Sequence, residues 1–190
     1  MDNSDYNVGV SVMNSIRRYI DSKYGDGVFD IKCKTYFPGY AEEKPDNISY
    51  PLKSLVNCLL DLSIEKESGF REYIVGMYKD IIISDLTSVN KSFIKSAGIR
   101  KTLRSSPQLI KNYFNVQEMN IIENSVGYCM YDLISDDYAS EWHLYGHEGI
   151  IQAILGICGN KMSEFKIHSK ITFLKNKMTF TKVNIELLYS

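Results

Sequence analysis

The sequence predicts an α+β fold, with an N-terminal helical subdomain followed by a β-β-α-β-β antiparallel sheet subdomain. Apolar residues recur at helical spacing up to about residue 116, whereas alternating patterns typical of strands dominate from Glu118 onward. Helices and strands that are segregated along the chain favour an antiparallel sheet over a doubly wound parallel one. No linker or repeat interrupts the pattern. We therefore expect a single domain over residues 1–190, with a mainly helical part (1–116) and a sheet-containing part (117–190).

Four stretches of the first part carry helical periodicity. They begin near Val12, Pro51, Gly69 and Pro107. Gly25 follows the first stretch, as expected for a residue just past a helix C-terminus. Pro51 and Pro107 suit the start of a helix, where a missing N–H group removes no internal hydrogen bond. Residues 26–50 hold several turn-forming residues and are expected to form a long loop.

The second part alternates apolar and polar residues in four segments. The expected strands cover residues 119–122, 128–134, 165–173 and 178–188. A polar, glycine-containing turn at 124–127 joins the first pair. A helix is expected from Ser140 to Cys158, because apolar residues recur at helical spacing and Gly159-Asn160 follows as a stop signal.

Composition excludes several classes of protein. The formal net charge of −1 and the pI near 6.3 exclude a strongly basic nucleic-acid-binding domain, so nucleic acid is not an expected partner. The first five residues are acidic and polar, unlike a secretory signal, and the most apolar stretches are interrupted and too short to cross a bilayer of about 30 Å. We therefore expect a cytoplasmic protein without a transmembrane segment.

The cysteines form no metal-binding or disulfide pattern. The four are scattered, without a C-x-x-C pair, at Cys33, Cys58, Cys129 and Cys158. Such residues are expected to be buried small hydrophobic side chains. Cys129 with a nearby histidine is an alternative nucleophile and base, but known catalytic motifs are absent from the sequence, so we expect no enzyme and assign no catalytic residue.

His143 and His147 are the candidate metal-binding and cofactor-binding residues. Four positions apart on a helix, their rings share one face and could bind Zn²⁺ or a haem iron, with Glu141, Glu148 or Cys129 as a further ligand. The alternative is that both are ordinary helix histidines, because the sequence offers no second pair of ligands at metal-binding spacing.

Charge is segregated along the chain. Residues 86–117 hold six basic residues and no acid, residues 118–148 hold seven acids and no Lys or Arg, and residues 165–185 hold five lysines and no acid. The candidate anion-binding residues of the first block are Lys91, Lys95, Arg100, Lys101 and Arg104. A basic surface of this kind could attract nucleic acid, a phosphorylated ligand or a lipid headgroup, and surfaces of opposite charge could steer self-association or a partner protein. An anion- or nucleic-acid-binding protein that uses the two basic segments is therefore a further alternative. The alternative is a solvated surface whose basic and acidic elements neutralise each other after folding.

The C-terminal half resembles a superfamily of small-ligand-binding domains. The segment 128–132 (Tyr-Cys-Met-Tyr-Asp), the segment 145–156 with its glycine-containing helix start, and the closing strand pair from Phe165 carry the resemblance. That superfamily joins haem-NO-binding-like domains, vinyl-reductase-type domains and TRAPP-like trafficking subunits. The resemblance implies a scaffold for ligand sensing or protein interaction.

The chain departs from the haem-binding members of that superfamily. Their proximal histidine lies in the helical region before the sheet, but residues 1–142 contain no histidine. Their Tyr-x-Ser-x-Arg motif is replaced by Tyr128-x-Met130-x-Asp132, and the acid would repel the haem propionates. Haem held in the family's usual manner is therefore not expected. Vinyl-reductase-type domains carry cysteines near the closing hairpin, where this chain has His168, Thr179 and Thr181.

Together, these features predict a non-enzymatic signalling module, a sensor or adaptor that binds a small apolar ligand or a protein partner. A homodimer is one form that such a partnership could take. The alternative function is a haem- or metal-binding gas or redox sensor that uses His143 and His147.

Overall fold

The computed structural model describes residues 7–8, 10–37, 50–113 and 117–190. Its helices are α1 (Val10–Tyr24), α2 (Val28–Tyr36), α3 (Leu52–Glu65), α4 (Phe70–Asp85), α5 (Ser88–Ala97), α6 (Ile99–Tyr113) and α7 (Ser140–Ile157). The strands are β1 (Asn7–Val8), β2 (Tyr50–Pro51), β3 (Glu118–Ser125), β4 (Tyr128–Asp136), β5 (Met162–Lys175) and β6 (Met178–Tyr189). The predicted α+β order, helices first and then β-β-α-β-β, is confirmed.

The main sheet is antiparallel throughout, with strand order β3-β4-β6-β5. Successive residues of a strand point to opposite faces, and the central strands β4 and β6 bury one face in register. Their paired core residues are Cys129–Leu187, Tyr131–Ile185 and Leu133–Val183. Tight turns close both hairpins, with positive φ at Gly127 (74°) and at Asn176 and Lys177 (52° and 66°).

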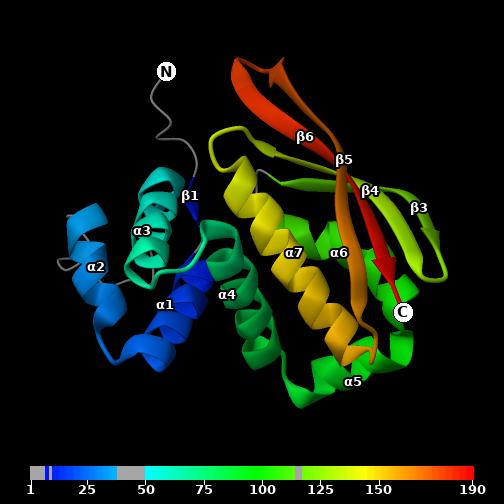
Figure 1. Cartoon of the computed structure of the whole chain (residues 1–190), viewed down its shortest axis with the longest axis horizontal. Helices are drawn as coiled ribbons and strands as arrows, with labels where there is room; N and C mark the ends of the chain where they lie inside the picture. Colours follow the sequence, from blue (N-terminus) through cyan, green and yellow to red (C-terminus); the bar gives the residue numbers. More distant parts are fainter. Residues whose placement is uncertain (1–6, 9, 38–49, 114–116) are drawn as a thin grey trace.

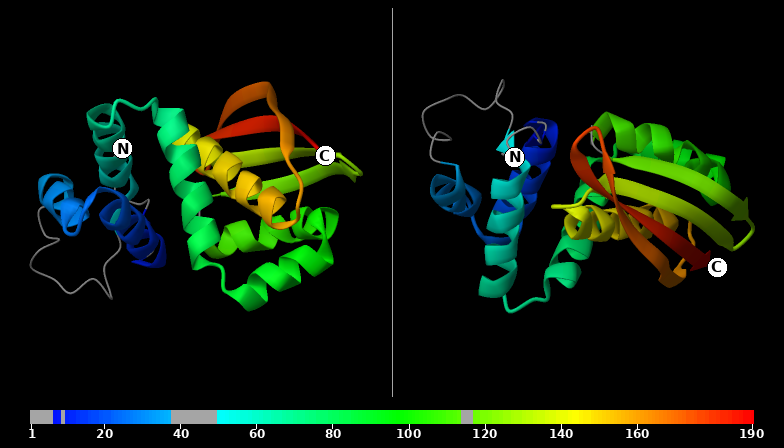
Figure 2. Two further views of the ribbon diagram at one scale, coloured as in Figure 1. Left: turned by 60° about the horizontal axis from the view of Figure 1, so that its bottom comes forward. Right: turned by 90° about the horizontal axis from the view of Figure 1, so that it is seen from above.

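Helix α7 lies between α4 and the sheet (Figure 1). Helices α1, α2 and α3 gather at one end of the molecule and the sheet lies at the other, which two further views confirm (Figure 2). Two buried clusters follow this division. One cluster contains residues of α1, α2, α3 and α4 together with Trp142 of α7. The other joins the sheet to Leu103 of α6 and to Leu144, Ile151 and Leu155 of α7. Helix α7 therefore belongs to both hydrophobic cores.

Close packing of α7 on α4 depends on two glycines. A Cβ atom at Gly149 would lie 2.4 Å from the Val75 carbonyl oxygen, and one at Gly146 would lie 2.9 Å from the Tyr78 ring. The crossing is also fixed by charge, because Arg71 donates to both carboxylate oxygens of Glu148 at 2.9 and 3.1 Å.

Two sequence-based expectations in the helical part were wrong. The expected long loop at 26–50 contains α2, whose Phe29 and Cys33 are buried one turn apart; residues 38–49 lie outside the described part. The helix expected to start at Pro107 begins eight residues earlier, at Ile99, and encloses this proline. Burial of Leu103 against the sheet and α7 keeps this segment helical despite the hydrogen bond that an interior proline removes.

Candidate functional site

A pocket of about 500 Å³ lies between α1 and α4, and α5 and α7 complete its wall. Its apolar lining includes Val12, Ile16, Tyr78, Ile81 and Ile150. Its polar lining includes Ser11, Asn14, Ser15, Arg18, Asp85 and Asn90. A volume of this size with an apolar lining and a few polar groups is typical of a site for a small organic ligand.

A polar cluster formed by Ser15, Arg18 and Asp85 lines part of this pocket. Arg18 Nη2 donates to Asp85 Oδ1 at 2.8 Å and to Ser15 Oγ at 3.1 Å, and the Ser15 hydroxyl also donates to Asp85. The cluster bridges α1 and α4 across 67 residues of sequence. It therefore places solvent-exposed polar groups, paired with one another, beside apolar side chains, an arrangement that suits an amphipathic ligand.

His143 has a carboxylate neighbour. Its Nε2 atom lies 3.1 Å from Asp136 Oδ2, and both side chains are 1% exposed. Asp136 Oδ1 accepts the Ala139 N–H at 2.8 Å and so supports the chain just before α7. One ring nitrogen of His143 is thus engaged in the contact that anchors the start of α7 to the end of β4.

His147 is buried without a hydrogen-bond partner. The residue is 2% exposed, its ring centroid lies 5.2 Å from that of Tyr131, and neither ring nitrogen is bonded to any residue that the structure describes. The Tyr131 hydroxyl, on β4, is buried and unpaired in the same way. Burial lowers the pKa of His147 to about 4, so the ring is neutral near pH 7. The two histidines that sequence spacing placed on one face therefore have different surroundings.

The described residues contain no group of three or more His, Cys, Asp or Glu side chains that could hold a metal ion. Cys129 is buried, and burial raises the pKa of its thiol to about 11. A thiol of that pKa is protonated at neutral pH and is a poor nucleophile. The metal-binding role of His143 and His147 stays a prediction.

The five candidate anion-binding residues do not face one common cavity. Lys91 lines a cavity that also involves Lys79 and Lys161, whereas Arg104 lines a separate hollow beside β3. Arg100 fixes α6 to β3, where it donates to the Asn124 carbonyl oxygen at 3.4 Å. Lys95 and Lys101 are exposed. No sequence signal pointed to Lys79 and Lys161, because both lie outside the basic segments 86–117 and 165–185.

The β4 residues that stand in place of the Tyr-x-Ser-x-Arg motif do not face the core under the helices. Alternation along β4 places Cys129, Tyr131 and Leu133 in the core under α6 and α7, so Tyr128, Met130 and Asp132 belong to the opposite face. Asp132 is occupied there, because Lys182 Nζ lies 2.7 Å from one of its oxygens and Asn184 donates to the other at 2.9 Å. On the helical side, Leu103 of α6 packs with the same core as α7.

Solved structures of H-NOX domains share this architecture. A single-substitution variant of Tt H-NOX matches 96% of this chain and 95% of its own, with a TM-score of 0.67 and 10% identity. An oxygen-binding H-NOX domain related to soluble guanylate cyclases matches 95% and 94%, with a TM-score of 0.65 and 10% identity. A Cs H-NOX variant carrying 4-cyano-L-phenylalanine matches 94% and 96%, with a TM-score of 0.61 and 13% identity.

These matches establish that the chain has the H-NOX fold, and they confirm the resemblance to haem-NO-binding-like domains at the level of structure. Neither a family model nor a curated protein matches the sequence. None of the helices in the described ranges has the length and apolar character needed to span a membrane.

Proposed function

We propose that this H-NOX-fold chain is a non-enzymatic cytoplasmic sensor or adaptor that binds a small apolar or amphipathic ligand in the pocket between α1 and α4. The observation that carries the proposal is the pocket itself, about 500 Å³ in volume with apolar walls and the Ser15–Arg18–Asp85 cluster. Ile150 of α7 lines the pocket, and α7 continues into the sheet core. A ligand that contacts α1, α4 and α7 would thus act on the helix that joins the two cores.

A neutral fluorophore, N-phenyl-1-naphthylamine, tests the pocket directly, since its fluorescence rises in apolar surroundings. Asn14 lines the pocket on α1, so Asn14→Phe should fill it and weaken probe binding at least tenfold. Thr35→Phe, on an exposed position of α2, adds the same ring elsewhere and should leave binding unchanged. Equal affinities for both folded variants and the unaltered protein would contradict the proposal.

A protein partner, such as a second copy of the chain, is the other half of the predicted adaptor role. Native mass spectrometry of freshly purified protein distinguishes a small-molecule ligand from a protein partner, because one spectrum reports bound small molecules, bound metal and subunit number. A co-purifying molecule of a few hundred daltons that is lost from Asn14→Phe supports the pocket. A dimer without a small molecule supports the partner role.

The alternative function is a metal- or haem-dependent sensor that uses His143 and His147, and one observation favours it. Both ring nitrogens of His147 are buried and unpaired in the described part of the chain, which is costly unless a ligand or water completes them. Zn²⁺ uptake measured by calorimetry should then be lost in His147→Ala and retained in His168→Ala, whose parent residue contacts Glu186 at 2.9 Å. If the unaltered protein takes up no Zn²⁺, the metal-binding version of this alternative is wrong. If no Soret band forms after haemin is added, the haem-binding version is wrong.

A further inference from the structure

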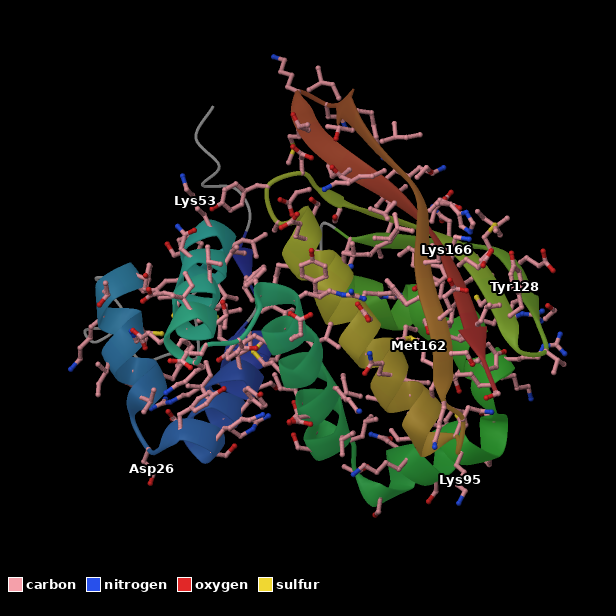
Figure 3. All side chains as sticks on the ribbon, viewed as in Figure 1. Asp26, Lys53, Lys95, Tyr128, Met162 and Lys166 are labelled. Carbon is pink, nitrogen blue, oxygen red and sulfur yellow. The ribbon has the colours of Figure 1, made fainter. Side chains whose placement is uncertain are left out.

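A second cavity, of about 690 Å³, lies where α4, α5, the end of α7 and the start of β5 meet. Three lysines from three separate segments line it: Lys79 of α4, Lys91 of α5 and Lys161, which lies just before β5. Met162, the first residue of β5, marks the position in Figure 3. The cavity is distinct from the pocket between α1 and α4, and none of its lining residues is shared with that pocket.

No side-chain ion pair within the described residues neutralises the positive charge of this cavity; beside it, the main chain of Ser190 pairs with that of Lys161, with N···O distances of 2.7 and 3.0 Å. No Asp or Glu lines the cavity, and none of the three lysines makes an ion pair within the described residues. Other lysines of this chain do have acidic partners, such as Lys182 with Asp132 at 2.7 Å. Asp80, next to Lys79 in sequence, is 3.6 Å from Lys23 instead. Three like charges around one concave surface raise the local concentration of anions.

The remaining lining combines amide groups with apolar surface. Gln152 and Asn160 contribute side-chain amides, which donate hydrogen bonds to phosphate oxygens, while Ala153, Ile157 and Met162 contribute apolar surface. Gly156 also lines the cavity, and a Cβ atom there would have no neighbour within 4 Å. The missing side chain therefore leaves room beside the lysines for a bulky group.

The C-terminus of a helix normally repels an anion, because its last carbonyl groups are unpaired. Here the chain after α7 folds back onto those groups. The N–H groups of Cys158, Gly159 and Asn160 donate to the carbonyl oxygens of Ile154, Gly156 and Leu155 at 2.9 to 3.1 Å. Capping of this kind reduces the negative potential that α7 would otherwise direct at the cavity.

We infer that this cavity binds a small organic phosphate, with the phosphate group among Lys79, Lys91 and Lys161 and an apolar group against Ile157 and Met162. The site goes beyond the proposed ligand pocket and does not depend on it. Only Lys91 belongs to the basic segment that the sequence indicated.

Phenyl phosphate is a suitable probe, with binding measured by calorimetry in low salt. The triple variant Lys79→Gln, Lys91→Gln, Lys161→Gln should lose affinity at least tenfold, because the charges that attract phosphate are removed. The control is Lys166→Gln, Lys170→Gln, Lys175→Gln on β5, which changes net charge equally at exposed positions away from the cavity (Figure 3 labels Lys166). Equal losses in both triple variants would overturn the inference in favour of general charge attraction.

A second variant keeps the charges and removes the space. Gly156→Phe should project into the open volume and abolish phenyl phosphate binding, while circular dichroism shows an unchanged fold. Inorganic phosphate should bind the unaltered protein more weakly than phenyl phosphate, since it has no apolar group. Equal affinity for the two compounds overturns the apolar part of the inference. Binding to vesicles containing phosphatidic acid but not to phenyl phosphate would replace the soluble phosphate with a lipid headgroup.

Binding of N-phenyl-1-naphthylamine distinguishes the two sites. The neutral probe should respond to Asn14→Phe and not to the triple lysine variant, and phenyl phosphate should show the opposite pattern. Failure of one proposal therefore leaves the other intact.

Discussion

Burial removes His147 from water without giving either ring nitrogen a hydrogen-bond partner among the described residues. The charged form is penalised most by this environment, and the pKa falls from 6.5 to about 4. His143, one turn earlier, instead lies beside the Asp136 carboxylate. The two histidines therefore differ because their neighbours on β4 differ. The spacing of residues along the helix does not predict those neighbours.

The lowered pKa of His147 predicts that acid destabilises the protein. Between about pH 6.5 and pH 4 the unfolded state binds a proton that the folded state excludes, so stability falls as pH decreases through this range. From pH 7.5 to pH 5 this histidine should contribute a loss of about 2 kcal/mol. Urea unfolding gives the free energy of unfolding of the unaltered protein and of His147→Leu at both pH values. The contribution of His147 is the difference between the two proteins in the free energy lost from pH 7.5 to pH 5.

His168→Gln is the matched control for this experiment, because His168 is an exposed residue on β5. Its stability at both pH values shows the effect of removing a histidine that lies outside the core. A His147→Leu variant that loses as much stability on acidification as the unaltered protein would show that this histidine does not exclude the proton.

At the scale of elements, the crossing of α4 and α7 depends on both close backbone approach and an ion pair. Gly149 allows the two backbones to approach, and Arg71 of α4 holds Glu148 of α7, whose side chain is only 6% exposed. The adjacent residues Glu148 and Gly149 thus provide, respectively, an electrostatic and a steric condition for the same helix pair.

Gly149→Ala should destabilise the fold by about 2 kcal/mol, because its Cβ atom would overlap the Val75 carbonyl group. Gly156→Ala is the control in the same helix. Its Cβ atom would meet nothing within 4 Å, so the higher helix propensity of alanine should stabilise the protein by roughly 0.5 to 1 kcal/mol. Thermal unfolding checks the opposite signs, and a similar change in both variants would contradict the steric argument.

Arg71→Ala should cost about 2 kcal/mol, because it leaves the buried Glu148 carboxylate without its charged donor. The double variant Arg71→Ala, Glu148→Gln should recover part of the loss, since a neutral amide is less costly to bury than a charge. Chemical denaturation of the unaltered protein, Arg71→Ala, Glu148→Gln and the double variant gives the coupling energy between the two side chains. A double variant less stable than Arg71→Ala would argue against a stabilising ion pair.

At the scale of the whole molecule, α7 joins two hydrophobic cores. Trp142, at its start, lies in the core of α1 to α4, and Leu155, near its end, lies in the core under the sheet. The pocket between α1 and α4 touches α7 at Ile150, between these two positions. Both cores are therefore packed against one and the same helix.

This arrangement predicts cooperative unfolding. Trp142 is the single tryptophan, so its fluorescence reports on the helical core, whereas far-ultraviolet circular dichroism reports on the whole chain. Leu155→Ala, in the sheet core, should lower the free energy of unfolding by about 2 to 4 kcal/mol. The unfolding midpoints followed by fluorescence and by circular dichroism should therefore fall together. A fluorescence midpoint that stays unchanged while the circular dichroism midpoint falls would show that the two cores unfold separately.

Local patterns in the sequence predicted most elements and their order. Gly127 and Gly159 have positive φ at the turn and helix end where the sequence placed stop signals, and both final strands are confirmed. The helix α2 was missed because it is short and its two buried residues, Phe29 and Cys33, acquire their role only when α2 packs against α1 and α3. The start of α6 was misplaced because Pro107 resembles a helix start, although burial of Leu103 outweighs it.

The sequence by itself determined the α+β order, the secondary structure of the sheet and the absence of histidine from the first 142 residues. Each of these depends on composition or on neighbours a few positions apart. Only the tertiary structure decided that His143 contacts Asp136, that His147 is enclosed with Tyr131, and that Lys79, Lys91 and Lys161 line one cavity. Those contacts join separate elements, so their geometry depends on how helices and strands pack and has no signature in local spacing.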